Sequence, residues 1–342
     1  MSNMNAAVFR GVNNLVVEDR PIPKIDRPDD VILEIYGCGI CGTDPKIIAG
    51  EHPVKNGIVL GHEYAGTVAK IGDKVKNVKV GDRVAVDVDV KCGSCYYCRT
   101  GRDNLCQNII TLGEHEDGGY AKYNRSPASS LYKIPDEMTL DAAILAGPIS
   151  CVVNTVQRAN VRPGQSVGII GAGPMGLHYL QLLKSSQAGS LVVYETKEER
   201  IANAKKFGAK RIINPSNEDA VKATKDLTEG RGLDVIIEAA GAPSATKLAL
   251  AMIGRGGRIV QFGINPQGAE VSIQPFDFTF RQIEYIGSFI SNYSFAAALD
   301  LLSAGKFEVD KFITHRLKVS DVNQGMDLMR KGECIKVMIV PD

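Results

Sequence analysis

The pattern of apolar residues changes character near Ala142. Before that point, residues 6–90 contain short apolar runs such as "AAVFR", "DVILEIYGCGI" and "EYAGTVAKIG", which are separated by glycine-containing turns. Runs of this kind, spaced about every eight to twelve residues, are typical of short strands in all-β folds. We therefore predict a small β-barrel or β-sandwich for the first part of the chain.

After Ala142, apolar runs alternate with amphipathic helices such as "PMGLHYLQLLKSSQ" and "KEERIANAKKFG". This alternation predicts a doubly wound parallel sheet with helices between its strands. The expected strands cover residues 166–170, 191–195, 211–214, 233–241, 257–263 and 283–288. Residues 289–342 contain two helical segments and a final strand, "IKVMIV", and their pattern does not assign them to either part.

Length and charge narrow the range of functions. A chain of 342 residues is long enough for two domains. The formal net charge of +1 argues against a nucleic-acid partner. No apolar run is long enough to cross a bilayer, so no membrane association is expected. The N-terminus does not resemble a signal peptide, and we therefore expect a cytoplasmic protein with reduced thiols.

Four of the eight cysteines are concentrated in "KCGSCYYCRTGRDNLC", residues 91–106. Cys92, Cys95 and Cys98 are separated by two-residue gaps, which let successive sulfurs face one centre, and Cys106 supplies a fourth sulfur. Four sulfurs close a tetrahedron, so the pattern predicts a structural zinc rather than a redox pair. A zinc module for nucleic acid would fit the spacing but not the charge.

A glycine-rich loop, "SVGIIGAGPMG", follows the expected strand at 166–170 and begins a helix. Gly171 permits the tight turn, Gly173 lets the backbone approach a pyrophosphate, and Gly176 allows close packing of helix on strand. Together with Pro174 and Met175, these glycines are the predicted dinucleotide-binding loop. The N-terminus of the helix would present free N–H groups to the phosphates.

An acidic residue ends the next expected strand. Glu195 follows Gly176 by nineteen residues, where a carboxylate can accept hydrogen bonds from ribose hydroxyls and repel a 2′-phosphate. NAD is therefore the preferred cofactor. Lys197 and Arg200 lie close by in the sequence and keep NADP as the alternative.

A second set of possible metal ligands lies in two glycine-flanked turns, "GCGICGTD" and "LGHEYAG". Cys41, His62 and Glu63 offer a sulfur, an imidazole and a carboxylate, which is a donor set that zinc accepts with one position left open. A lone histidine after glycine is usually only a turn residue. The cysteine cluster and the dinucleotide loop favour the metal interpretation here.

These motifs, with "VGDRVAV" and "DGGYAKY", resemble the zinc-containing medium-chain dehydrogenases and are most similar to their polyol and sorbitol dehydrogenase branch. The resemblance implies an α/β protein with a GroES-like β-barrel catalytic domain, residues 1–148 and 289–342, that carries a structural zinc lobe at 91–107. It also implies a Rossmann NAD-binding domain at 149–288, and a homodimer or homotetramer.

The same resemblance implies roles for individual residues. Cys41, His62 and Glu63 correspond to the ligands of a catalytic zinc. Asp44 corresponds to an acid that orients the ligating imidazole. Thr43 corresponds to the hydroxyl that passes on the proton of the substrate.

Two positions depart from the family pattern. Gly147 precedes Pro148 where polyol-type relatives have a glutamate near the zinc, and Cys151 is a possible substitute for that acid. Lys46 stands where relatives often have a histidine that completes the proton relay, and it could pass a proton or hold a ribose hydroxyl.

The sequence thus favours a zinc-dependent oxidoreductase that moves a hydride from a secondary alcohol of a polyol, sugar or sugar acid to NAD. Two alternatives stay open. One is a dehydrogenase of an amino alcohol such as threonine, and the other is a non-catalytic, zinc-stabilised NAD-binding protein. The motifs do not identify the individual alcohol.

Overall fold

The structure is a computed structural model that describes residues 3–342, and it divides into two compact units. The first combines Met1–Ser150 with Asn292–Asp342, and the second is Cys151–Ser291. None of the helices in the described part of the chain is long and apolar enough to span a membrane.

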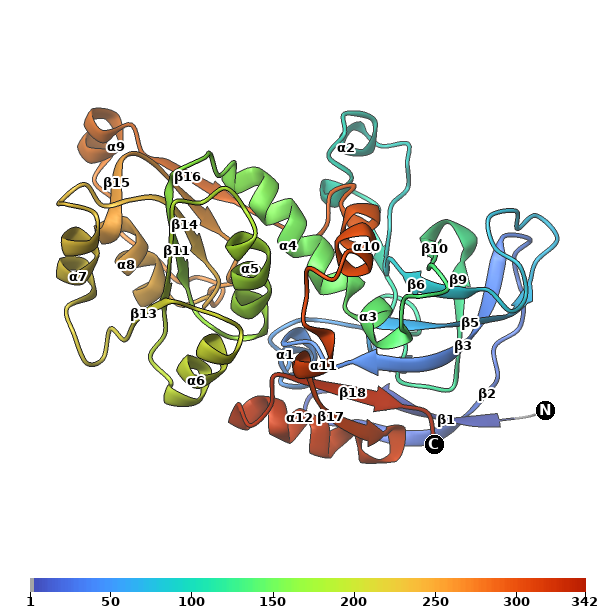
Figure 1. The fold of residues 1–342 in the computed structure, drawn as a ribbon. Coiled ribbons are helices and arrows are strands. Elements are labelled where there is room, and N and C mark those ends of the chain that lie inside the picture. The colour runs from blue at the N-terminus through green and yellow to red at the C-terminus, as the bar shows by residue number, and fades with distance from the viewer. Residues whose placement is uncertain (1–2) are drawn as a thin grey trace. The chain divides into compact units, whose positions relative to one another are not determined.

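The first unit is built from β-sheets with short helices around them (Figure 1). Its strands are β1 (Asn3–Phe9), β2 (Leu15–Pro21), β3 (Asp30–Gly39), β4 (Ile58–Val59), β5 (Tyr64–Ile71), β6 (Arg83–Val86), β7 (Asp89–Val90), β8 (Ile110–Thr111), β9 (Tyr123–Pro127), β10 (Leu131–Lys133), β17 (Ile313–Lys318) and β18 (Lys336–Val340). Its helices are α1 (Thr43–Ile48), α2 (Tyr96–Arg99), α3 (Leu140–Ile144), α10 (Phe295–Ser303), α11 (Val309–Phe312) and α12 (Val322–Lys331). Helix α4 (Ala146–Ala159) runs from the first unit into the second.

Strand β3 is the centre of the largest sheet, whose order is β10-β6-β5-β3-β18-β17 with β9 also paired to β3. Other strands pair with it along both edges, and nearly all of its side chains are buried. Strand β5 crosses it so closely that a Cβ on Gly66 would lie 2.2 Å from the Glu34 carbonyl oxygen. Glycine is therefore required where the two strands meet.

The C-terminal segment completes this sheet. Strand β18 pairs antiparallel with β3, with Met338 opposite Gly39, and β17 pairs in parallel with β18. In Figure 1 the red C-terminal strands accordingly lie beside the blue N-terminal ones. The sequence pattern predicts the last strand but not β17, whose side chains alternate between half-buried and exposed without a strong apolar signal.

The second unit is a six-stranded parallel sheet of order β13-β12-β11-β14-β15-β16. Its strands are β11 (Ser166–Ile170), β12 (Ser190–Tyr194), β13 (Arg211–Ile213), β14 (Leu233–Glu238), β15 (Ile253–Gln261) and β16 (Glu284–Gly287). Its helices are α5 (Pro174–Lys184), α6 (Glu198–Lys206), α7 (Ala220–Leu227), α8 (Pro243–Met252) and α9 (Pro275–Arg281). The predicted doubly wound fold is confirmed, and all six predicted strands are present.

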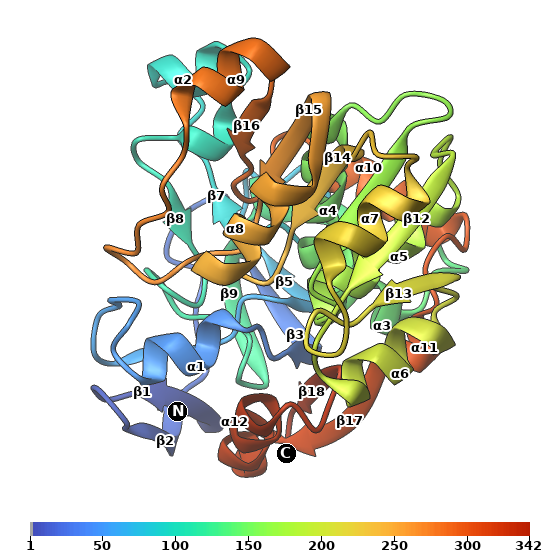
Figure 2. The ribbon, with the colours of Figure 1, turned by 90° about the vertical axis from the view of Figure 1, so that its left-hand side faces the viewer.

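Helices cover both faces of this sheet. Figure 2 shows α7 and α8 in front of the strands, whereas α5 packs against β11 and β12 on the other face. Strand order reverses between β11 and β14, because the chain leaves β11 in one direction along the sheet and later continues from β14 in the other. In open α/β sheets, ligands bind outside the carboxyl ends of the strands at such a switch point.

Removing residues 336–342 is expected to unfold the first unit, because β17 joins its sheet only through β18. The truncation removes the buried side chains of Val337, Met338 and Ile339. At about 1.5–3 kcal/mol each, their loss approaches the whole stability of a domain. A control that removes only residues 341–342 should unfold at the wild-type denaturant concentration. Cooperative, wild-type unfolding of the longer truncation would contradict this role of β18.

Candidate active site and metal centres

The predicted cysteine cluster is assembled. The sulfurs of Cys92, Cys95, Cys98 and Cys106 all lie within 4.8 Å of one another. Among residues 3–342, no other group of three or more cysteine, histidine or acidic side chains meets that distance. Turns around α2 bring three of the sulfurs together, and the short helix Asp103–Leu105 delivers the fourth.

Backbone N–H groups point at these sulfurs. Donation from Ser94 and Cys95 lowers the pKa of the Cys92 thiol to about 5, and the N–H groups of Cys92 and Asn108 each lie 3.4 Å from the Cys106 sulfur. Burial instead raises the pKa of Cys98 to about 12. Thiolates are the form that binds metal, so a cluster that already favours thiolate at one corner fits a tetrahedral zinc.

A second site is organised around Asp44, which is completely buried at the start of α1. Its Oδ2 accepts hydrogen bonds of 2.8 Å from the backbone N–H of Cys41 and from the Tyr120 hydroxyl. Its Oδ1 lies 3.6 Å from Nδ1 of His62, and neither of these two atoms has a hydrogen-bond partner. The carboxylate therefore turns Nδ1 of the imidazole toward itself and leaves Nε2 for a metal.

The electrostatics of this site agree with that orientation. Burial by itself lowers the pKa of His62, but the negative charges of Asp44 and Cys41 outweigh it and raise the pKa well above the ordinary value. Burial raises the pKa of Asp44, opposed by His62 and by its hydrogen bonds. The negative surroundings of the ring would stabilise a metal cation in the same way, bound to the neutral imidazole.

Cys41 and Thr43 lie beside this pair. The Cys41 sulfur is 3.6 Å from the Thr43 hydroxyl oxygen and also interacts with the His62 ring. The fold therefore brings Cys41, Thr43, Asp44 and His62 together. Lys46, one turn further along α1, has an exposed side chain.

Glu63 lies differently from its neighbours. Its carboxylate is buried and accepts a 2.5 Å hydrogen bond from the ammonium group of Lys336, which also donates to the Ile40 carbonyl at 2.9 Å. Cys41, His62 and Glu63 accordingly do not form a group within 4.8 Å of one another. The sulfur of Cys41 and the imidazole of His62 interact with each other, whereas Oε2 of the carboxylate is bonded to the lysine.

The glycine loop has the predicted geometry. Gly171 has a φ of +96°, and a Cβ on Gly176 would lie 1.9 Å from the Gly171 carbonyl oxygen, so α5 can start directly against the loop only with glycine there. Gly173 caps α5, and Pro174 and Met175 form its first turn. The loop follows β11 at the switch point, where a pyrophosphate would meet the helix N-terminus.

Glu195 is turned toward the backbone around this loop. Its buried carboxylate accepts hydrogen bonds from the N–H groups of Ala172, Thr196 and Lys197 at 2.7–2.9 Å. The guanidinium of Arg200 lies 3.9 Å from the same carboxylate and next to Gly173. Glu195 therefore holds the loop through a hydrogen bond to its backbone, and the guanidinium of Arg200 lies beside the loop.

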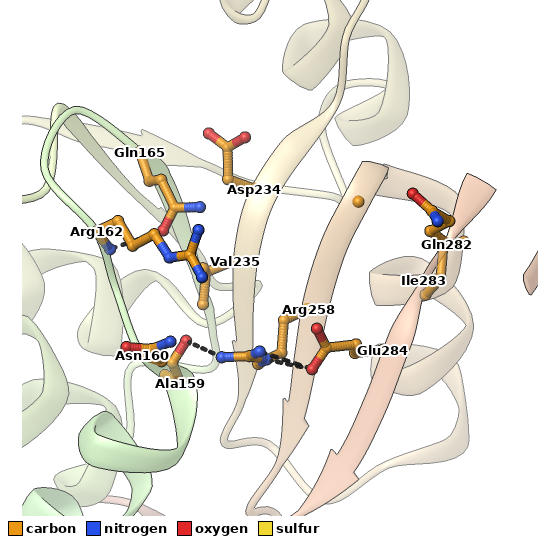
Figure 3. Close-up of a pocket in the computed structure, with 11 residues that line it drawn as sticks. Ala159, Asn160, Arg162, Gln165, Asp234, Val235, Arg258, Gln282, Ile283 and Glu284 are labelled. Carbon is orange, nitrogen blue, oxygen red and sulfur yellow. Dashed lines mark hydrogen bonds and ion pairs between the residues drawn. The ribbon is translucent and has the colours of Figure 1, made fainter.

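A cavity of about 540 Å³ lies at the opposite end of this sheet, near the amino ends of β11, β14 and β16 (Figure 3). Three of the charged side chains in its lining are bonded within the protein. Arg258 binds Glu284 at 2.7 Å and the Ala159 carbonyl at 3.2 Å, and Asp234 accepts from the Ser166 N–H. It is therefore distinct from the crevice at the glycine loop.

Comparisons with known proteins identify the class. The alcohol dehydrogenase GroES-like domain matches residues 27–136, and the zinc-binding dehydrogenase family matches residues 174–304. The chain belongs to the zinc-binding alcohol dehydrogenases. It is an enzyme, with zinc and NAD as the cofactors of its family, which confirms the predicted family and fold.

Individual relatives match along their whole length. Sorbitol dehydrogenase of Bacillus subtilis is 33% identical over 99% of this chain and 98% of its own. L-threonine 3-dehydrogenase of Caldanaerobacter subterraneus is 35% identical over 94% of each chain. A zinc-binding dehydrogenase from Sinorhizobium meliloti bound to NADP has a TM-score of 0.95 and 32% identity, and each chain is covered completely.

Sequence reasoning missed two residues that hold the site. Lys336 and Tyr120 bind Glu63 and Asp44, yet both are far from their partners in the sequence. The lysine at the start of the apolar strand "IKVMIV" was the available signal, because a buried lysine needs a partner. For Tyr120, the sequence offered only its position in the motif "DGGYAKY".

Replacing Cys95 by serine is expected to lower the zinc content by one equivalent per chain, because three sulfurs no longer close the tetrahedron. Elemental analysis after dialysis measures this, and proteolysis should then cut within residues 91–107. Cys334→Ser, which changes a thiol outside both sites, is the control. Wild-type zinc content together with wild-type proteolysis in Cys95→Ser would show that Cys95 is not a ligand.

Proposed function

We propose that this enzyme oxidises a secondary alcohol of a polyol, sugar or sugar acid and transfers the hydride to NAD. The observation that carries the proposal is the buried contact of Asp44 with Nδ1 of His62, which aims Nε2 to the same side as the Cys41 sulfur. The similarity to a sorbitol dehydrogenase supports a polyol-type substrate.

Cys41 and His62 would hold the catalytic zinc, which when bound supplies Lewis acidity that makes an alcohol hydroxyl easier to deprotonate. Asp44 fixes the tautomer and the direction of the imidazole. The Thr43 hydroxyl, beside Cys41, accepts the proton at Oγ1 and passes it toward solvent, where Lys46 stands. Glu63 is our proposed third ligand. Lys336 bonds only its Oε2, so the other oxygen could bind the metal once the carboxylate moves toward Cys41 and His62.

The alternative substrate is an amino alcohol such as threonine, because a threonine dehydrogenase is as similar in sequence as the sorbitol enzyme. The two classes differ in charge. A polyol presents only hydroxyls, whereas threonine presents an ammonium and a carboxylate that need charged partners. Activity with NAD on polyols, sugar acids and threonine separates the classes.

For the cofactor we propose that NAD is preferred and that NADP is also accepted. The Glu195 carboxylate is engaged by three backbone N–H groups, which weakens its repulsion of a 2′-phosphate. Arg200 beside Gly173 offers that phosphate a guanidinium. The relative bound to NADP is consistent with this proposal.

We further propose that the first unit is the catalytic domain and the second the NAD-binding domain, and that the protein is a cytoplasmic homodimer or homotetramer. Strand β16 ends its sheet with one side unpaired. Exposed aromatic side chains of Phe276, Phe280 and Tyr285 lie on and near it. All eight cysteines are free thiols, which suits a reducing compartment.

Cys41→Ser is expected to reduce polyol-dependent NAD reduction by about three orders of magnitude, since Lewis acidity contributes several kcal/mol at 1.36 kcal/mol per tenfold. NADH binding should be unchanged, because the glycine loop lies in the other unit. Turnover is followed by NADH absorbance, with Cys334→Ser as the control. Wild-type turnover in Cys41→Ser would refute the mechanism.

Arg200→Ala is expected to raise the KM for NADP at least about tenfold and the KM for NAD less than about threefold, because only NADP carries the phosphate. Lys206→Ala, which removes an exposed cation in the last turn of α6, is the control. Equal changes in the two KM values would show that Arg200 does not read the 2′-phosphate.

A further inference from the structure

A buried acid ends the strand on the other side of the switch point. Glu238 is the last residue of β14 and has no exposed surface. It is in register with Ile170 at the end of β11 and with Gln261 at the end of β15. Three strand ends therefore meet at one level, at the switch point where the glycine loop follows β11.

Every contact of the Glu238 carboxylate is with a donor. Its Oε1 accepts from the backbone N–H groups of Ala240 at 2.7 Å and Gly241 at 2.9 Å, and its Oε2 accepts from the side-chain amide of Gln261. With three N–H donors and no acceptor around it, the ionised carboxylate is the form that satisfies the site.

The direction of the Gln261 amide is fixed from its other end. Its Nε2 also donates to the Gly263 carbonyl at 2.6 Å, and a carbonyl can only accept, so the NH₂ group is the end that faces Glu238. Its Oε1 then accepts hydrogen bonds from the Tyr285 hydroxyl at 2.9 Å and the Thr246 hydroxyl at 3.2 Å. A chain of donors and acceptors thus runs from the edge strand β16 to the turn after β14. Its polarity is fixed by the Glu238 carboxylate and the Gly263 carbonyl, which only accept.

The turn Ala239–Gly241, which these hydrogen bonds hold, is closely packed on two sides. A Cβ on Gly171 would lie 3.1 Å from the Ala240 nitrogen and Cβ, so the turn packs directly on the dinucleotide loop. On its other side, a Cβ on Gly263 would lie 2.2 Å from the Gly241 nitrogen. A change in the turn is therefore passed on to the glycine loop.

We propose that Glu238 is a positioning residue for the dinucleotide. Through its contact with the Gln261 amide, it fixes the conformation of the turn Ala239–Gly241, which would form one side of the cofactor site. This inference rests on the proposed function, because it assumes that the crevice binds NAD. It assigns Glu238 no contact with the reacting atoms.

The test exchanges donor and acceptor in the contact between residues 238 and 261. In Glu238→Gln, the new amide can satisfy the turn only by pointing its NH₂ group at the NH₂ group of Gln261. In the double variant Glu238→Gln/Gln261→Glu, the amide of residue 238 donates to a carboxylate at 261, which also accepts from Tyr285 and Thr246. The swap therefore restores the other links, but it replaces the bond from Gln261 to the Gly263 carbonyl by a contact between two acceptors.

NADH affinity of the purified, metal-loaded enzyme is measured by the fluorescence of bound NADH, which is simplified because the chain has no tryptophan. We expect Glu238→Gln to weaken binding about tenfold and to raise the KM for NAD with little change in kcat. The swap should return both values to within about threefold of wild type.

Asp234→Asn is the matched control, because Asp234 lies on the same strand and its carboxylate also accepts backbone and hydroxyl donors, but at the opposite end. It should lower thermal stability without weakening NADH binding. If Glu238→Gln binds as tightly as wild type, or the swap fails to restore binding in a folded protein, the inference is wrong. If wild type itself does not bind NADH, the proposed function fails instead.

Discussion

The candidate catalytic site depends on one buried carboxylate, that of Asp44. It joins the start of α1, the turn before β5 and the segment around Tyr120, which are distant in the sequence. A buried charge is costly unless it is hydrogen-bonded and paired. Its two hydrogen bonds meet part of that cost, and the imidazole of His62 faces the remaining oxygen. The same contact thus stabilises the fold and fixes the direction in which His62 can bind a metal.

The pair of Glu63 and Lys336 imposes a second constraint. Both side chains are about 95% buried, so removing either would leave an uncompensated charge in the interior. Since Lys336 is on β18, this part of the site is complete only when the last strand has joined β3. The contact explains physically why the two ends of the chain form one unit. It also places a cation on one oxygen of the carboxylate that is the proposed third metal ligand.

The sequence was most informative where the chemistry is local. The glycine loop and the cysteine cluster lie within short stretches, and the spacing of their residues determines how they can fold. The contacts of Glu63 with Lys336 and of Asp44 with Tyr120 could not be predicted, because they depend on how distant strands pair. Strand β17 was missed since its register is set by β18 rather than by an apolar face of its own.

Asp44, Glu195 and Glu238 are buried carboxylates that are stabilised in the same way. Each is buried beside a loop and accepts at least one hydrogen bond from a backbone N–H close to it in the sequence, and Glu195 and Glu238 accept two such bonds. A carboxylate with several such donors keeps its charge at moderate cost and holds the loop in a single conformation. Catalysis and cofactor binding both need groups fixed to within a fraction of an ångström, and loops by themselves do not provide this. Buried acids that brace these loops from inside supply the rigidity, while the loop surfaces stay free for ligands.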